Sequence, residues 1–141
     1  MTESSFEQVI AERGELIYTH VGSSMRPLLK PRDLLVIKRV TEKPRRLDIV
    51  LYKRDSGRYV LHRILKVREH DYVLCGDNCL DKEVGITDSH IIGVLTDIVR
   101  NCRNISVYSL SKRLYAHIWC DTFIVRRACM FIRKIYRRFK D

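Results

Sequence analysis

Residues 22–28 read Gly-Ser-Ser-Met-Arg-Pro-Leu and follow residues 15–21, in which apolar and polar side chains alternate. Such alternation is typical of a strand with one buried face. Gly22 permits backbone angles closed to other residues, and Pro27 fixes its own φ and favours an extended conformation in the residue before it. The stretch therefore predicts a sharp corner after a strand, where the hydroxyl of Ser24 is accessible to a substrate. The same residue types are also typical of an ordinary surface turn.

A later segment supplies a base for this hydroxyl. His62 stands 38 positions after Ser24, within Tyr59-Val60-Leu61-His62-Arg63, which has the pattern of a strand. A serine hydroxyl is a weak nucleophile until a base removes its proton, and an imidazole titrates close to neutral pH. His62 alone would be interpreted as an ordinary strand histidine, but together with Ser24 it is the candidate general base. The other histidines have no such context and are interpreted as surface or structural residues: His20, His70, His90 and His117.

Two further blocks, Asp33-Leu34-Leu35-Val36 and Gly76-Asp77-Asn78, complete an ordered set between Tyr18 and Arg100. The set resembles the signal peptidase I family, in the superfamily that also contains the LexA-type self-cleaving repressors. A histidine in place of lysine as the base is similar to the endoplasmic-reticulum and archaeal type. The resemblance implies a serine endopeptidase that cleaves extended, signal- or leader-like peptide segments with no metal and no cofactor.

The resemblance also implies a third, acidic residue that holds the imidazole and stabilises its charged form. The family position falls on Glu83, although the family itself has Asp there. Asp77 is an alternative, or it ties the loop together through backbone hydrogen bonds, and Asp81 is a third candidate.

For the oxyanion, the resemblance implies the backbone N–H of Ser24 as the main donor. Some relatives add a side-chain hydroxyl two places earlier, but that position is Gly22 here, so backbone groups or Ser23 would have to serve. Met25 and Leu28 are candidate walls of the substrate pocket and equally candidate core residues.

The fold predicted from the pattern is mainly β, because short strands with turn signals between them recur along the chain. The resemblance implies a coiled β-ribbon or barrel-like domain of the signal peptidase/LexA type. A helix is expected over residues 4–13, capped by Ser4 or Ser5 and ended by Gly14. The predicted strands cover residues 15–21, 34–37, 48–53, 58–67, 71–75, 91–100 and 105–108.

The C-terminal segment differs from the rest of the chain. The formal net charge is +10, and residues 112–141 hold nine Lys and Arg against two Asp. Apolar residues recur there at helical spacing with basic residues between them, and a break is expected near Asp121-Thr122. We therefore divide the chain into a catalytic domain, residues 1–109, and a basic amphipathic tail, residues 110–141. The expected partner of the tail is an anionic membrane surface; docking on its own domain or on another protein is the alternative, and nucleic acid is not expected.

Five cysteines without a repeated spacing argue against a disulfide framework and for a reducing compartment. No signal peptide or membrane-spanning stretch is visible in the sequence, so the N-terminal anchor that the resemblance would suggest is not found. The expected location is cytoplasmic or peripheral on the inner membrane face. Two other functions stay open, a LexA-like self-cleaving regulator and a non-enzymatic membrane- or RNA-binding adaptor.

Overall fold

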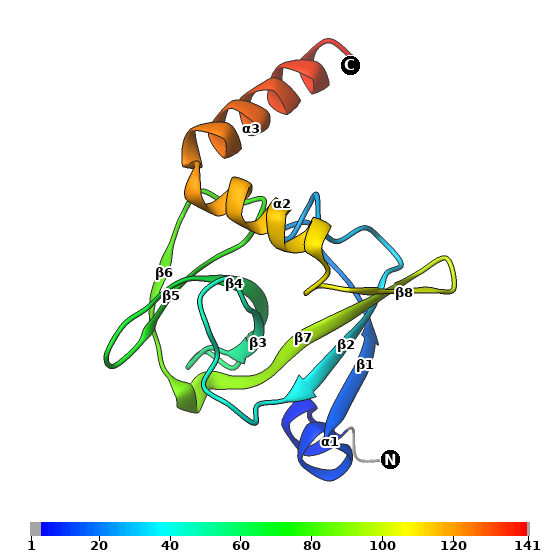
Figure 1. Cartoon of the computed structure of the whole chain (residues 1–141), viewed down its shortest axis with the longest axis vertical. Coiled ribbons are helices and arrows are strands. Elements are labelled where there is room, and N and C mark those ends of the chain that lie inside the picture. The colour runs from blue at the N-terminus through cyan, green and yellow to red at the C-terminus, as the bar shows by residue number, and fades with distance from the viewer. Residues whose placement is uncertain (1–3, 141) are drawn as a thin grey trace.

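The computed structural model describes residues 4–140 and is mainly β, with eight strands in one antiparallel sheet (Figure 1). The sheet order is β1-β2-β7-β3-β4-β5-β6, and β8 pairs with β7. The strands are β1 (Glu15–Thr19), β2 (Leu34–Arg39), β3 (Ile49–Lys53), β4 (Tyr59–Val67), β5 (Tyr72–Cys75), β6 (Glu83–Ile86), β7 (Ile91–Arg100) and β8 (Arg103–Ser106). The helices are α1 (Phe6–Arg13), a one-turn 3₁₀ helix η1 (Asp88–His90), α2 (Leu110–Asp121) and α3 (Phe123–Arg138). The predicted mainly β class is therefore confirmed.

The sheet is curled rather than flat. Register shifts interrupt the β2–β7, β3–β7, β4–β5 and β5–β6 ladders. An extra residue on one strand of a pair bends that strand and increases its twist. Figure 1 shows the result, with β3, β4 and β7 curving around a common interior.

Local signals explain most of the element boundaries. The Ser5 hydroxyl accepts a hydrogen bond from the Gln8 N–H and caps α1, and Gly14 ends the helix with φ of 79°. Asp55-Ser56-Gly57 connects β3 to β4 as an antiparallel hairpin, as expected. β8 begins two residues earlier than predicted, because Asn101 and Cys102 both adopt positive φ and close the turn from β7 tightly.

The corner after β1 is anchored in the main core. Met25 and Leu29 are fully buried and pack with Leu16, Ile37 and other apolar residues of α1, β1, β2 and β7. Burial of a side chain of this size stabilises a fold by about 1.5–3 kcal/mol. A second cluster, between β3, β4 and β5, includes Tyr52.

The C-terminal segment forms two helices with different surroundings. α2 lies across the top of the sheet in Figure 1, with Ala116, Trp119 and Cys120 buried. The helical segment is interrupted at Thr122, where a break was expected, and α3 then extends away from the sheet (Figure 1). The first part of the predicted tail is thus packed on the β domain. None of the helices within residues 4–140 combines the length and the apolar character that crossing a bilayer demands.

Candidate active site

Ser24 lies half-buried at the corner, directly before the anchored Met25. Gly22 has φ of 105°, a region that favours glycine, and so allows the chain to turn out of β1. The Leu29 N–H donates to the Met25 carbonyl at 3.0 Å, which makes the segment after the serine a compact turn. Met25, predicted as either pocket wall or core, is a core residue.

The loop of residues 76–79 holds the serine segment from the other side. The Asn78 N–H donates to the Ser24 carbonyl at 2.7 Å, and the Asn78 side-chain amide donates to the Ser23 carbonyl at 3.1 Å. These bonds cross more than fifty positions of sequence. The position of Ser24 therefore depends on the Gly-Asp-Asn block that the sequence singled out.

Gly76 lies between the Ser24 backbone and the His62 ring. A Cβ at residue 76 would lie 2.5 Å from the Ser24 carbonyl oxygen and 3.1 Å from His62 Nε2. Only glycine fits there, and the serine backbone and the imidazole approach each other across it. The hydrogen bonds within residues 4–140 include none between the Ser24 hydroxyl and His62. Catalytic hydrogen bonds are often completed only when substrate binds.

The other side of the His62 ring contacts a tyrosine. His62 Nδ1 lies 3.3 Å from the Tyr52 hydroxyl, which donates to Glu83 Oε2 at 2.5 Å. Glu83 is held in turn by Arg54, whose Nε and Nη2 donate to its two oxygens at 2.7 and 2.8 Å. Tyr52 and His62 are diagonal neighbours on β3 and β4, because Tyr52 pairs with Val60 in the hairpin. The Glu83 carboxylate is thus linked to the His62 imidazole through the Tyr52 hydroxyl.

This chain of contacts determines the tautomer of the histidine. A phenol has one proton, and Tyr52 donates it to Glu83. In the contact between Tyr52 and His62, the donor is therefore the imidazole Nδ1–H. Nε2 then carries the free lone pair, and Nε2 is the nitrogen beside Gly76 and Ser24. The nitrogen of His62 that can accept a proton is therefore the one that lies beside Gly76.

The pKa shifts agree with this assignment. Burial lowers the pKa of His62 below its ordinary value, and the negative charge of Glu83 opposes that effect. The hydrogen bonds from Arg54 lower the pKa of Glu83, so the carboxylate is charged at neutral pH. Burial and the Glu83 carboxylate raise the pKa of Tyr52, so the phenol keeps its proton. At neutral pH, His62 is therefore a neutral imidazole that can accept a proton.

Asp77, the alternative acid, makes contacts that support the fold. Its carboxylate is fully buried and accepts from Arg63 Nε and Nη2, both at 2.8 Å, and from the Tyr115 hydroxyl at 3.0 Å. The Trp119 indole N–H donates to the Asp77 carbonyl at 2.6 Å. Asp77 therefore joins β4 to α2, and its oxygens are occupied by partners other than His62. Asp81 is exposed, and its backbone carbonyl accepts a hydrogen bond from the Cys75 thiol at 3.3 Å.

A cleft of about 630 Å³ opens beside Ser24 and His62. One wall is the end of β1 and residues 20–24, including the predicted Gly22 and Ser23, and the other is residues 58–62 at the start of β4. Within the described part of the chain, β1 pairs only with β2. Residues 59–62 of β4 pair only with β3, because β5 joins β4 from Arg63 onward. Two strand edges with free backbone groups therefore border the cleft.

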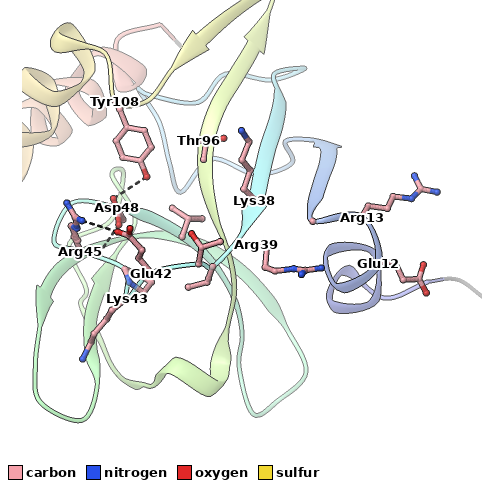
Figure 2. Close-up of a pocket in the computed structure, with 15 residues that line it drawn as sticks. Glu12, Arg13, Lys38, Arg39, Glu42, Lys43, Arg45, Asp48, Thr96 and Tyr108 are labelled. Carbon is pink, nitrogen blue, oxygen red and sulfur yellow. Dashed lines mark hydrogen bonds and ion pairs between the residues drawn. The ribbon is translucent and has the colours of Figure 1, made fainter.

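A different cavity, of about 780 Å³, lies between α1, β2 and the connection from β2 to β3 (Figure 2). Its lining is charged, and Figure 2 shows Tyr108 pointing to Asp48, which it contacts at 3.3 Å. Arg45 pairs there with Glu42. No serine, cysteine or histidine lines this cavity. It therefore has no counterpart of the serine and histidine that line the Ser24 cleft.

The structure thus brings together Ser24, His62 and, through Tyr52, Glu83. Sequence reasoning missed Tyr52 and Arg54. The hairpin register, set by the Asp55-Ser56-Gly57 turn, is the signal that could have found Tyr52. No family model, curated protein or solved structure matches this chain. The function is therefore inferred from the residues and their geometry.

Proposed function

We propose that the protein is a serine endopeptidase of the signal peptidase I type that cleaves extended peptide segments. The observation that carries this proposal is that Ser24 and His62 line the same cleft, with His62 Nε2 beside Gly76 and Nδ1 of the same ring in contact with Tyr52, which donates to Glu83. The curled antiparallel sheet is compatible with the coiled β-ribbon of that family, to which we assign the fold.

Substrate binding follows from the two free strand edges. An extended peptide in the cleft pairs its backbone with β1 on one side and with residues 59–62 of β4 on the other. Recognition through the backbone tolerates variable side chains except where one enters a pocket. The peptide passes Ser24, which lines the same cleft.

In the first half of the reaction, Ser24 Oγ attacks the scissile carbonyl carbon while His62 Nε2 takes the hydroxyl proton. The Ser24 backbone N–H donates to the oxyanion, a contribution worth roughly 3–4 kcal/mol in serine hydrolases. The imidazolium then gives its proton to the leaving amine as the carbon–nitrogen bond breaks. The amino-terminal part of the substrate is then bound to Ser24 as an acyl-enzyme, and the carboxyl-terminal part leaves with a new free amino group.

In the second half, a water molecule replaces the amine. His62 Nε2 takes a proton from the water, which attacks the acyl carbon, and the imidazolium returns a proton to Ser24 Oγ as the ester breaks. The carboxylate product leaves and the free enzyme is restored. Through both halves, Nδ1–H stays bonded to Tyr52, and the Glu83 charge stabilises the imidazolium.

The proposal is tested by incubating the purified chain with a peptide library and identifying products by mass spectrometry. We expect internal cleavage by the wild type and none by Ser24→Ala, with unchanged circular dichroism. Equal cleavage by Ser24→Ala would overturn the proposal. The chain incubated alone serves as the control for self-cleavage, because Ser24-dependent fragments of the chain itself would indicate a self-cleaving regulator instead.

A further inference from the structure

α3 carries its basic residues on one half of its surface and most of its apolar residues on the other. At 100° per residue, the apolar half is continuous over more than four turns. Its members are Ile124, Val125, Ala128, Phe131, Ile132, Ile135, Tyr136 and Phe139. The opposite half carries the basic residues, which are Arg126, Arg127, Arg133, Lys134, Arg137, Arg138 and Lys140.

The helix is attached to the β domain through its basic half. Arg126 is fully buried, and its Nη1 donates to the carbonyl oxygens of Gly76 at 3.2 Å and Cys79 at 3.1 Å. Arg133, two turns later, contacts the Asn78 side chain at 3.5 Å. Both contacts are made by the basic half of α3, which is the half that faces water in an ordinary amphipathic surface helix.

The apolar half consequently faces solvent. Phe131 and Ile132 are each 64% exposed, and Ile124 and Phe139 are more than 80% exposed. Figure 1 shows α3 extending beyond α2 and the sheet. Exposed apolar surface of this extent marks an interaction site in a soluble fold.

We infer that α3 lies in the surface of an anionic membrane, with its apolar half in the acyl boundary. Three exposed cations, Arg127, Lys134 and Arg138, flank that half and can reach acidic headgroups while the apolar stems of their side chains stay in the acyl boundary. Nucleic acid would use the cations but leave the aromatic and aliphatic side chains exposed. An apolar protein groove would use those side chains but not the dense cationic flank. This inference goes beyond the proposed peptidase function and does not depend on it.

Co-sedimentation of the full chain with phosphatidylcholine vesicles, with and without phosphatidylglycerol, tests the inference. We expect binding only to the anionic vesicles and weaker binding at high salt. Phe131→Ser with Ile132→Ser should lower the partition coefficient at least about tenfold. Each of Arg127→Gln, Lys134→Gln and Arg138→Gln should lower it about fivefold at low salt. Val84→Ser removes an equally exposed apolar side chain from β6 and should change nothing.

Amide hydrogen exchange of the wild type provides a second measurement that needs no variant. We expect anionic vesicles to protect residues of α3 and to leave β3 and β4 unchanged. Equal binding to neutral vesicles, no binding to either, or binding to a single-stranded RNA oligomer without vesicle binding would each overturn the inference. Vesicle binding that survives the Phe131→Ser and Ile132→Ser changes would also overturn it.

Discussion

Replacement of Asp77 by asparagine tests whether the acid that supports the fold differs from the acid that we propose orients His62. The Arg63 and Asp77 side chains are 5% and 0% exposed, and two 2.8 Å hydrogen bonds join them. Loss of one partner of a buried ion pair leaves an uncompensated charge and typically costs about 3–5 kcal/mol. The Tyr115 hydroxyl also loses a charged acceptor, which loosens α2.

A loss of that size is a large share of the stability of a domain, which is typically about 5–15 kcal/mol. With a urea m-value of about 2 kcal/mol/M, the unfolding midpoint should fall by roughly 2 M. The assay is urea denaturation followed by circular dichroism. Glu83→Gln is the matched control, because Glu83 and Arg54 are partly exposed and their pair contributes at most about 1 kcal/mol.

In the peptide-cleavage assay, Glu83→Gln should have the larger effect, whereas Asp77→Asn has the larger effect on stability. Glu83→Gln should lower kcat/KM strongly with little change in the urea midpoint. Asp77→Asn should retain the activity of whatever fraction stays folded. If Asp77→Asn kept full stability and lost activity to the level of His62→Ala, Asp77 would be the orienting acid and the role given to Glu83 would be refuted.

Three further predictions concern the contacts of His62. Tyr52→Phe removes the acceptor of the imidazole Nδ1–H, and kcat/KM should fall about ten- to a hundredfold, since hydrogen bonds to charged groups contribute about 1.5–3 kcal/mol; an unchanged rate would refute the assignment of Tyr52. Gly76→Ala places a Cβ 2.5 Å from the Ser24 carbonyl, so it should destabilise the fold by about 1–3 kcal/mol and abolish cleavage in the folded fraction, measured by urea denaturation and peptide assay. Activity should rise with pH as His62 loses its proton, with a midpoint below the usual histidine pKa because burial lowers it; Glu83→Gln removes a charge that raises this pKa and should move the midpoint lower still, whereas a shift upward would contradict the electrostatic argument.

Much of the fold could be predicted because its signals are local. The Ser5 cap, Gly14, and the alternation in the β3–β4 hairpin each depend on a few adjacent residues. β6 was missed because it has only four residues and includes Gly85, whose φ is 79°. Short strands of this kind form only because a neighbouring strand offers hydrogen bonds.

The sequence indicated Ser24 and His62, which line one cleft, but it did not indicate the residues that connect them to the rest of the structure. Tyr52 belongs to a buried apolar run and resembles a core residue until the hairpin register places it beside His62. The role of Asp77 depends on Arg63, fourteen positions away and brought close only when β4 pairs with β5. Likewise, the amphipathic pattern of α3 was visible, but its attachment through Arg126 depends on loop carbonyls that only the folded chain presents.

The central claim is that Ser24 and His62 act as one unit, and a double-mutant cycle on peptide cleavage tests it most directly. We predict that Ser24→Ala and His62→Ala each lower kcat by at least about a thousandfold, and that the double variant is no slower than either single one. The claim would be contradicted if the loss of kcat in the double variant equalled the product of the two single losses. Substantial turnover by either single variant with the wild-type fold would also contradict it.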